Sequence, residues 1–230
     1  MLLLLFDIDG TLVAGAAKAH SQALKLALKE VHGVDPDDVR GRIGPAGRTD
    51  GEIARLILLN LGVSALRIDE RADDVRDACC RIYAQICPRD LSSCVVPGIP
   101  EVLAWLSDRD GVQLGLLTGN FEPVARLKLK RAGLGKRFPS GVGAFGSDSE
   151  DRVTLPPIAR RRAGKPGGPV ARDETIVIGD TPRDIACARA DGVRCVAVTS
   201  GQYGPDELAD ADAVATDANE LREALRELGA

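Results

Sequence analysis

The sequence is poor in the features that mark several common classes of protein. Only 3% of its 230 residues are aromatic, which is few for a pocket that stacks nucleic-acid bases. The net charge of -4 gives no general attraction to nucleic acid or to an anionic membrane surface. We therefore expect no nucleic-acid partner, and any bound anion must be held by a local arrangement of residues.

Long apolar segments are also missing. The run Met1–Phe6 is too short for the core of a signal peptide, has no basic leader and continues directly into carboxylates. No other stretch is long and apolar enough to span a bilayer. The sequence therefore predicts a cytoplasmic protein without a membrane partner, either a monomer or a homodimer.

Cysteine patterns that bind zinc are absent. The cysteines show no paired CxxC spacing, and the two histidines, His20 and His32, lie far from them in the sequence. We expect the cysteines to be reduced and mostly buried. With 44% hydrophobic residues, the chain can form one large domain, or a domain with a substantial insertion.

What the sequence does contain is an apolar run that ends in two carboxylates. Leu2–Phe6 is typical of a buried strand, and Asp7 and Asp9 follow it. Because strand side chains alternate, residues at i and i+2 leave the strand on the same side. Gly10 permits a sharp turn and the Thr11 hydroxyl can fix it, although a strand followed by an ordinary Asx turn gives the same pattern.

A helical block follows this first strand. No convincing strand pattern lies between Val13 and Leu91. We expect residues 14–89 to form an inserted, all-helical cap. Apolar residues at helical spacing predict three helices there: Ala16–Val31, Asp50–Leu61 and Leu66–Ile86.

Strands and helices alternate from Pro100 onward. This alternation predicts an α/β fold with a parallel sheet and helices on both faces, made by residues 1–13 and 90–230. Such sheets place their sites at the carboxyl ends of the strands. Besides a short segment near Val142, the later strands are predicted at Val112–Leu117, Thr175–Ile178, Arg194–Val198 and Ala213–Ala215.

The strand predicted to end at Leu117 continues as Thr118-Gly119-Asn120 before a helix. A hydroxyl and free backbone N–H groups at a helix N-terminus form a local anion site. Asn120 can equally be an ordinary N-cap of that helix, and the two roles are compatible.

A second pair of carboxylates follows the strand Thr175–Ile178. Thr181 is suited to cap the next helix, and Asp184 lies about one turn beyond Asp180. Acids that converge repel one another unless a cation lies among them, and oxygen ligands suit Mg²⁺. An acid in the first turn is also favourable through the helix dipole alone, which is the alternative interpretation of Asp184.

Three motifs occur in a fixed order, FDIDGT, LLTGN and IGDTPRD, and each closes a predicted strand. In this combination the chain resembles the haloacid dehalogenase superfamily of phosphatases over essentially its whole length. The helical block is similar to the cap of the phosphoglycolate-phosphatase-like branch. The resemblance implies a Rossmann-like core and a Mg²⁺-dependent phosphatase for a small phosphorylated metabolite, with phosphoglycolate as the family-level candidate.

The resemblance also implies roles for single residues. Asp7 would be the nucleophile that forms an aspartyl-phosphate, and Asp9 the general acid and base. Thr118 and the Gly119 N–H would hold the phosphoryl group. The ligands of Mg²⁺ would be Asp7, the Asp9 backbone carbonyl and Asp180, with Asp184 in support.

The family's lysine has no obvious counterpart. It commonly opens the helix before the last acidic strand in a Lys-Pro pair, where this chain has Glu150-Asp151-Arg152. Arg152 has the position but not the side chain, and Lys165 is followed by proline but lies beyond the predicted helix. We favour Lys128, whose flexible stem could bring an ammonium group back to the phosphate, as a catalytic and phosphate-binding residue.

The cap offers candidates for substrate recognition. Arg42 and Arg48 lie in Gly-rich segments between predicted cap helices, which suits a lid that closes over the site. Their guanidinium groups could pair with a carboxylate or a second phosphate of the substrate. The alternative is that both are ordinary surface arginines.

Three other functions compete with this one. A dehalogenase of the same superfamily lacks the second acid, which is present here as Asp9. A sugar phosphomutase uses a cap histidine, and His20 lies near the start of the predicted cap. A non-catalytic phosphate sensor has no need of Asp9.

Overall fold

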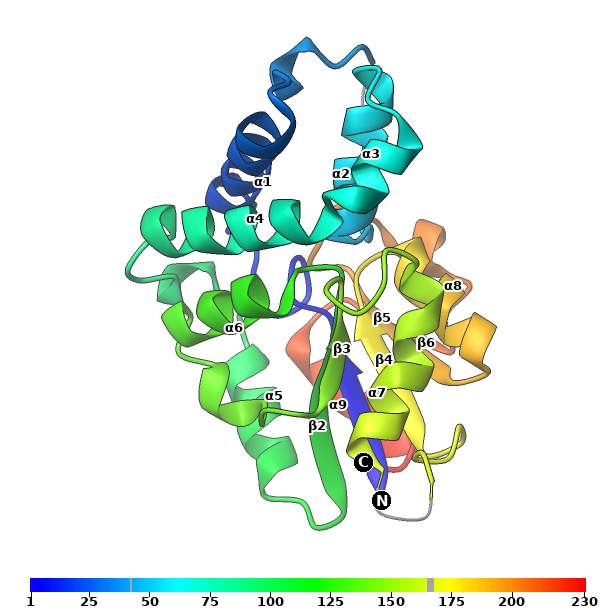
Figure 1. Ribbon diagram of the computed structural model, residues 1–230. Helices are drawn as coiled ribbons and strands as arrows, with labels where there is room; N and C mark the ends of the chain where they lie inside the picture. The colour runs from blue at the N-terminus through cyan, green and yellow to red at the C-terminus, as the bar shows by residue number, and fades with distance from the viewer. Residues whose placement is uncertain (42, 165–167) are drawn as a thin grey trace.

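The computed structural model describes residues 1–41, 43–164 and 168–230. At its centre is a six-stranded, fully parallel sheet in the order β3-β2-β1-β4-β5-β6 (Figure 1), which confirms the predicted fold class. β1 lies in the middle, so its end is central to the sheet. The strands are β1 (Leu2–Phe6), β2 (Val112–Thr118), β3 (Gly143–Phe145), β4 (Thr175–Gly179), β5 (Arg194–Val198) and β6 (Ala213–Ala215).

Helices cover both faces of this sheet, and the alternation of β1 explains why. Leu4 and Phe6 belong to one apolar cluster, whereas Leu3 and Leu5 belong to a second cluster on the opposite face. The first face is covered by α5 (Ile99–Ser107), α6 (Glu122–Arg131) and α9 (Ala218–Glu227). The second is covered by α7 (Leu155–Ala163) and α8 (Pro182–Asp191).

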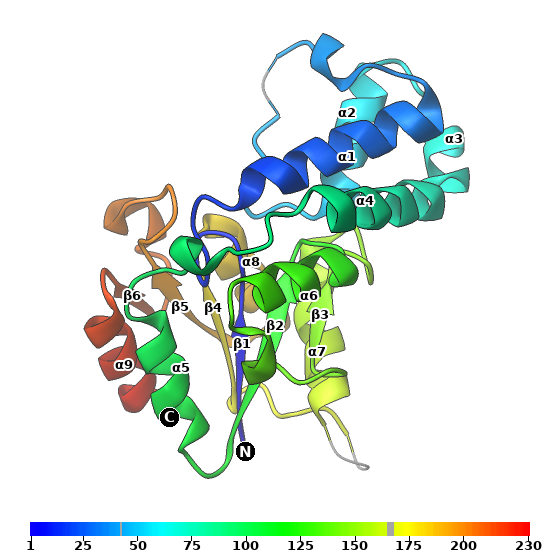
Figure 2. The same cartoon turned by 90° about the vertical axis from the view of Figure 1, so that its left-hand side faces the viewer.

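Four helices lie above the carboxyl ends of the strands (Figure 2). We call residues 14–89 the cap, a division of the chain that stays a prediction. Its apolar side chains form one continuous cluster with those of the first sheet face. The cap helices are α1 (Ala17–His32), α2 (Asp50–Asn60), α3 (Ala65–Glu70) and α4 (Ala72–Ile86).

The prediction of one helix over Leu66–Ile86 is wrong. The helix is interrupted at Arg71, whose N–H bonds to the Ile68 carbonyl at 3.2 Å, three residues back. The interruption allows Ile68 of α3 and Val75 of α4 both to be buried in the core. The apolar spacing runs through both helices, so the sequence pattern alone does not reveal the break.

The predictions about membrane-spanning segments and about the cysteines can be compared with the structure. No helix in the part of the chain that the structure describes has the length and apolar character needed to cross a membrane. All six cysteines are free. Four of them are buried, which agrees with the prediction: Cys79, Cys87, Cys187 and Cys195.

Candidate active site

A cavity of about 290 Å³ lies where the carboxyl ends of β1, β2 and β4 meet the cap. Sheet and cap both contribute to its walls. From the core come Asp7, Asp9, Thr118, Gly119, Asn120, Arg152 and Asp180; from the cap come Ala17, His20, Leu24, Arg48, Asp50 and Ile53.

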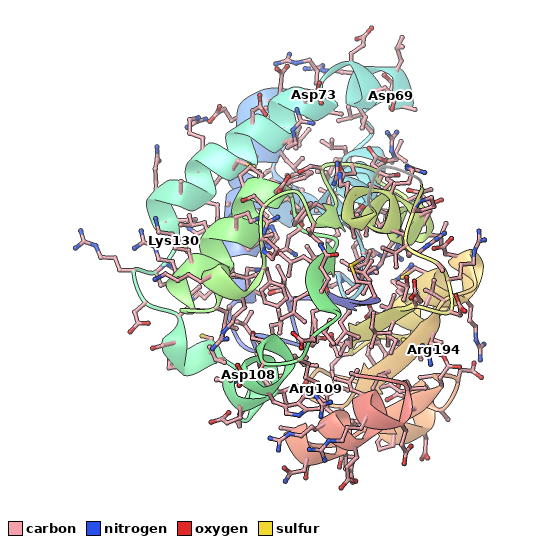
Figure 3. All side chains as sticks on the ribbon, turned by 90° about the horizontal axis from the view of Figure 1, so that it is seen from below. Asp69, Asp73, Asp108, Arg109, Lys130 and Arg194 are labelled. Atoms are coloured by element: carbon pink, nitrogen blue, oxygen red, sulfur yellow. The ribbon has the colours of Figure 1, made fainter. Side chains whose placement is uncertain are left out.

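A wider depression of about 820 Å³ lies at the amino ends of the strands, bordered by Asp108, Arg109 and Arg194. Figure 3 shows these three residues from below, far from the cap. None of the predicted site residues that the structure describes lines this depression. The cavity beneath the cap is therefore the candidate active site.

Three carboxylates meet on one side of this cavity. One oxygen from each of Asp7, Asp180 and Asp184 lies within 4.8 Å of the others. Burial raises the pKa of Asp7 to about 6, and burial together with the charges of Asp7 and Asp184 raises that of Asp180 to about 8. This set of buried, mutually repelling oxygen ligands fits Mg²⁺.

The residues around Asp180 hold its carboxylate close to the backbone. Thr11 Oγ1 donates a hydrogen bond to Asp180 Oδ1 at 3.1 Å. A Cβ at Gly10 would lie 2.1 Å from Asp180 Oδ2, and one at Gly201 only 1.8 Å from it. Gly10 also has a φ of +90°, which favours glycine, so the short DGT turn is needed both for the chain reversal and for this carboxylate.

Asp184 is fixed by its own helix terminus. The Thr181 N–H and Thr181 Oγ1 donate to Asp184 Oδ2 at 3.0 and 2.7 Å, and Thr181 caps α8, as predicted. The other oxygen of Asp184 is ion-paired with Arg152. Both oxygens of Asp184 are therefore engaged by protein groups, whereas those of Asp7 are more open to a ligand.

Arg152 reaches two of the three carboxylates, those of Asp7 and Asp184, from a short 3₁₀ turn, η4 (Arg152–Thr154), that precedes α7. Its Nη2 lies 3.5 Å from Asp7 Oδ2 and within 3.5 Å of the Leu117 carbonyl. Its Nη1 donates to the Gly47 carbonyl of the cap at 3.3 Å. Arg152 thus provides a fixed positive charge beside the predicted nucleophile.

Lys128 is fully buried and is not among the residues that line the cavity, but its ammonium group binds two residues that are, Asp9 and Asn120. Its ammonium group donates to both carboxylate oxygens of Asp9 at 2.7 Å and to Asn120 Oδ1 at 2.8 Å. Burial by itself raises the pKa of Asp9, but the charge of Lys128 and the hydrogen bonds from Lys128 and Asn120 outweigh it and hold that pKa below its ordinary value. Lys165 lies outside the described residues, so of the three candidates the structure places Lys128 beside Asp9 and Arg152 beside Asp7.

The predicted phosphate loop lies directly under the cap. Thr118 is completely buried at the end of β2. The next residue packs so closely that a Cβ on Gly119 would lie 2.1 Å from the Arg48 carbonyl oxygen. The Gly119 carbonyl accepts a hydrogen bond from the Asp50 N–H at 2.8 Å. Cap and phosphate loop are therefore in backbone contact.

The interpretation of Asn120 as an N-cap is wrong. Its Nδ2 donates to Asp9 Oδ2 at 2.9 Å, so its side chain binds a carboxylate of the cavity and does not cap α6. The first residue before α6 is Phe121, whose N–H donates to Asp50 Oδ2 at 2.8 Å. The acceptor for this helix end thus comes from the cap, far away in sequence, which removes the need for a local cap.

Of the two arginines predicted to recognise the substrate, the structure describes only Arg48. Arg42 lies outside the described residues. Arg48 lines the cavity, but its guanidinium group pairs with Glu52 and donates through Nε to the Gly44 carbonyl at 3.0 Å. Its charge is thus matched within the cap.

Two residues of the site were missed from the sequence. Asp50 was visible only as an acid at the start of a predicted helix, a common position for acids. Asn120 was noticed but assigned to the wrong partner. Neither residue carries a local signal for its contacts, because the partners of both come from other elements.

Comparison with known proteins agrees with this arrangement. A family model described as haloacid dehalogenase-like hydrolase matches residues 1–192. A phosphoglycolate phosphatase of Rhodospirillum rubrum is 31% identical over 217 residues, which cover 92% of this chain and 84% of that protein. One of Pseudomonas syringae pv. syringae is 30% identical over 202 residues, covering 86% and 70%.

Solved structures support the fold. A hydrolase from Pseudomonas syringae superposes with a TM-score of 0.67 at 23% identity, and the match covers 100% of both chains. A β-phosphoglucomutase from Clostridium difficile gives 0.69 at 18% identity, covering 99% of this chain and 96% of that one.

These matches confirm the predicted superfamily and the predicted enzyme class, a hydrolase of phosphoric monoesters. The three motifs that carried the prediction all lie within the matched range and surround one cavity. The chain belongs to the haloacid dehalogenase-like hydrolase family.

Proposed function

We propose that this protein is a Mg²⁺-dependent phosphatase that hydrolyses a small phosphomonoester through an aspartyl-phosphate on Asp7. One observation carries the proposal: Asp7 forms a cluster with two other buried acids and shares a cavity with Asp9, a separate acid that is held by Lys128. A binding protein without catalysis has no use for this second, separately held acid.

The first half-reaction begins at Asp7. Its carboxylate oxygen attacks phosphorus in line with the leaving group, the phosphorus–oxygen bond to that group breaks, and Asp9 donates a proton to the departing oxygen. The Thr118 hydroxyl and the Gly119 N–H bind the phosphoryl oxygens. Since the pKa of Asp9 is low, the donated proton enters with the substrate, whose phosphate has a second pKa near ~6.

In the second half-reaction a water molecule attacks the phosphorus of the aspartyl-phosphate. Asp9 removes a proton from this water, the bond between phosphorus and the Asp7 oxygen breaks, and inorganic phosphate leaves. Lys128 keeps Asp9 ionised and oriented for this step. Its contact with Asp9 supports a catalytic role, and direct contact of Lys128 with phosphate stays a prediction.

Mg²⁺ would be held by Asp7, Asp180 and the Asp9 backbone carbonyl, with Asp184 in support. When bound it offsets the repulsion between the Asp7 carboxylate and the anionic phosphate. Arg152 contributes a fixed positive charge at the same edge of the cavity, 3.5 Å from Asp7 Oδ2.

Phosphoglycolate is the first substrate to examine, because curated relatives carry that name. Its carboxylate would need a positive partner in the cap, and Arg42 and Arg48 are the candidates from the sequence. If Arg42→Ala and Arg48→Ala both leave kcat/KM for phosphoglycolate unchanged, neither arginine recognises the substrate.

A sugar phosphomutase is the second candidate, because His20 lines the cavity from the cap. This alternative predicts conversion between sugar phosphate isomers with little release of phosphate. A cytoplasmic location and a monomeric or homodimeric state are proposed on the sequence alone.

The deciding experiment measures inorganic phosphate release from a panel of small phosphorylated metabolites, with Mg²⁺ and with EDTA. We expect release that needs metal and disappears in Asp7→Asn. Asp9→Asn should be slower by about 10²–10⁴-fold, since it removes the acid and base. Isomer conversion without release would favour the mutase, and a well-folded protein inactive on the whole panel would contradict both functions.

A further inference from the structure

Asp50 contacts the core more closely than its position in the cap suggests. It is the first residue of α2 and is only 3% exposed. Its backbone N–H donates to the Gly119 carbonyl at 2.8 Å, and its Oδ2 accepts the Phe121 N–H at 2.8 Å. One cap residue thus binds the phosphate loop on both sides of Asn120.

These two bonds set the orientation of the two peptide groups that follow the Gly119 N–H, the proposed phosphate donor. A peptide unit is planar and trans, so its N–H points opposite to its carbonyl. Because the Gly119 carbonyl is bonded to the cap, the Asn120 N–H of the same unit points away from the cap, and lies 3.4 Å from Thr118 Oγ1. The Phe121 N–H, free at the start of α6 without Asp50, is also satisfied.

The Asp50 carboxylate is also connected, through His20 and Lys128, to Asp9, the proposed acid and base. His20 Nε2 lies 3.0 Å from Asp50 Oδ2, and His20 Nδ1 lies 3.5 Å from Lys128 Nζ. Lys128 in turn binds both oxygens of Asp9 at 2.7 Å. A continuous polar chain therefore runs from Asp50 in the cap to Asp9 at the catalytic position.

Burial of the Asp50 carboxylate costs folding free energy, which is unfavourable for a residue with only a structural role. Burying a carboxylate requires compensation by hydrogen bonds or charges. Among the described residues, the ion-pair partner of Asp50 is His20, with no lysine or arginine within salt-bridge distance. Its remaining compensation comes from the N-terminal end of α6, which attracts negative charge.

We propose that Asp50 is a positioning residue for phosphoryl transfer, which orients the phosphate loop directly and the Lys128–Asp9 pair through His20. The inference rests on the proposed phosphatase function. It means that docking of the cap does more than cover the cavity: the phosphate-binding groups and the acid and base are aligned only when Asp50 is in place.

The test compares two variants of Asp50 with a matched control. Asp50→Asn retains an acceptor for the Phe121 N–H and lacks the charge, whereas Asp50→Ala lacks both. Asp217→Ala is the control, because Asp217 caps α9 through the Asn219 and Glu220 N–H groups at 2.7 and 3.0 Å, outside the cavity. The measurements are kcat and KM for p-nitrophenyl phosphate at saturating Mg²⁺, and the inhibition constant of inorganic phosphate.

We expect Asp50→Ala to lower kcat/KM by about 100-fold, the effect of misplaced catalytic groups. The inhibition constant of phosphate should rise about tenfold, since the loop that binds it is no longer oriented. Asp50→Asn should lie between Asp50→Ala and the wild type, and Asp217→Ala should stay within about twofold of the wild type. His20→Gln should lower kcat with little change in the phosphate constant, because it affects the Lys128–Asp9 pair and not the loop.

Equal kinetics for Asp50→Ala and Asp217→Ala would overturn the inference and leave the phosphatase function intact. A wild-type protein without phosphate release would instead reject the proposed function. If Asp50→Ala does not fold, Asp50→Asn and His20→Gln carry the test: unchanged kcat in both would also overturn it. Amide hydrogen exchange at Gly119–Glu122 gives a readout that is independent of catalysis, and unchanged protection in Asp50→Asn would contradict the loop contact.

Discussion

Two buried positive residues pair with three carboxylates at the candidate active site. Lys128 pairs with Asp9, and Arg152 lies against Asp7 and Asp184. A lysine presents a compact charge that can be enclosed by one carboxylate and one amide, whereas the planar guanidinium group of Arg152 contacts several oxygens at once. Lys128 and Arg152 are therefore both placed to supply positive charge to the site, each beside a different acid.

The Lys128–Asp9 ion pair allows a prediction of how activity depends on pH. Lys128→Met removes the charge that lowers the pKa of Asp9, so that pKa rises. Because the proposed role of Asp9 as the base in hydrolysis of the aspartyl-phosphate requires an ionised carboxylate, the acidic limb of the kcat profile should move to higher pH. We expect a loss of about 3 kcal/mol in the free energy of unfolding, since a partly buried carboxylate loses its partner. The exposed Lys130 on the same helix provides the control: Lys130→Met should change neither the profile nor the stability.

The position of Asp180 in the acidic cluster allows a prediction of how Mg²⁺ changes the melting temperature. Asp180→Asn removes one of three mutually repelling acids, so without metal the variant should melt at a higher temperature than the wild type. It should also lose most of the stabilisation by Mg²⁺. Thermal unfolding in EDTA and in Mg²⁺ measures both effects, and a lower Tm of the variant in EDTA would contradict the account of this cluster.

At the scale of elements, the contact between the loop after β2 and the segment before α2 joins core and cap. The Gly119 carbonyl and Asp50 share a backbone hydrogen bond, and α6 begins with its Phe121 N–H bound to the cap. The next N–H of α6, that of Glu122, donates to Ser147 Oγ at 2.8 Å. The N-terminus of α6 is thus completed by two other segments of the chain.

Gly119→Ala tests this contact. Gly119 has no positive φ, so alanine suits its backbone, but a Cβ would lie 2.1 Å from the Arg48 carbonyl oxygen and 2.9 Å from Thr49 Cα. The cap segment must move away, and we expect kcat/KM to fall about 100-fold through misplacement of the loop. Gly44→Ala is the control, since no atom of the described residues lies within 4 Å of a Cβ at that position. Equal activity of both variants would show that the cap accommodates the methyl group.

At the scale of the whole molecule, the raised pKa values make stability depend on pH. The pKa of Asp180 rises from 3.8 to about 8 and that of Asp7 to about 6 on folding. Between pH ~4 and ~8 these two groups therefore bind more protons in the folded protein than in the unfolded chain, and their contribution to stability falls as the pH rises through this window.

The metal-free protein should accordingly melt at a lower temperature at pH 8 than at pH 5. Added Mg²⁺ should raise the Tm most at pH 8, where the carboxylates are ionised, with about 2.7 kcal/mol of stabilisation at one hundred times its Kd. Thermal unfolding in EDTA and in Mg²⁺ across this range is the measurement. The same pH dependence in Asp7→Asn and in the wild type would exclude Asp7 as a source.

Local patterns in the sequence were enough to predict the sheet and the edge of it at which the site lies. An apolar strand followed by Asp7, and two later strands ending at Thr118 and Asp180, obey rules that act over a few residues: alternation along strands, turn residues and helix caps. Parallel strands bring their carboxyl ends to one edge, so these local patterns also predicted which residues would meet. The capping box of Thr181 and Asp184 is of the same kind, because its partners are three residues apart.

Long-range packing, in contrast, sets the partners of most polar side chains at the site. The break at Arg71, the orientation of Asn120, the contacts of Asp50 and the separate positions of Lys128 and Arg152 depend on groups that other elements bring close. Lys128 lies 119 residues from Asp9, and Phe121 lies 71 residues from Asp50. A buried polar group binds whatever donor or acceptor the packing provides, and packing over such distances leaves no pattern among neighbouring residues.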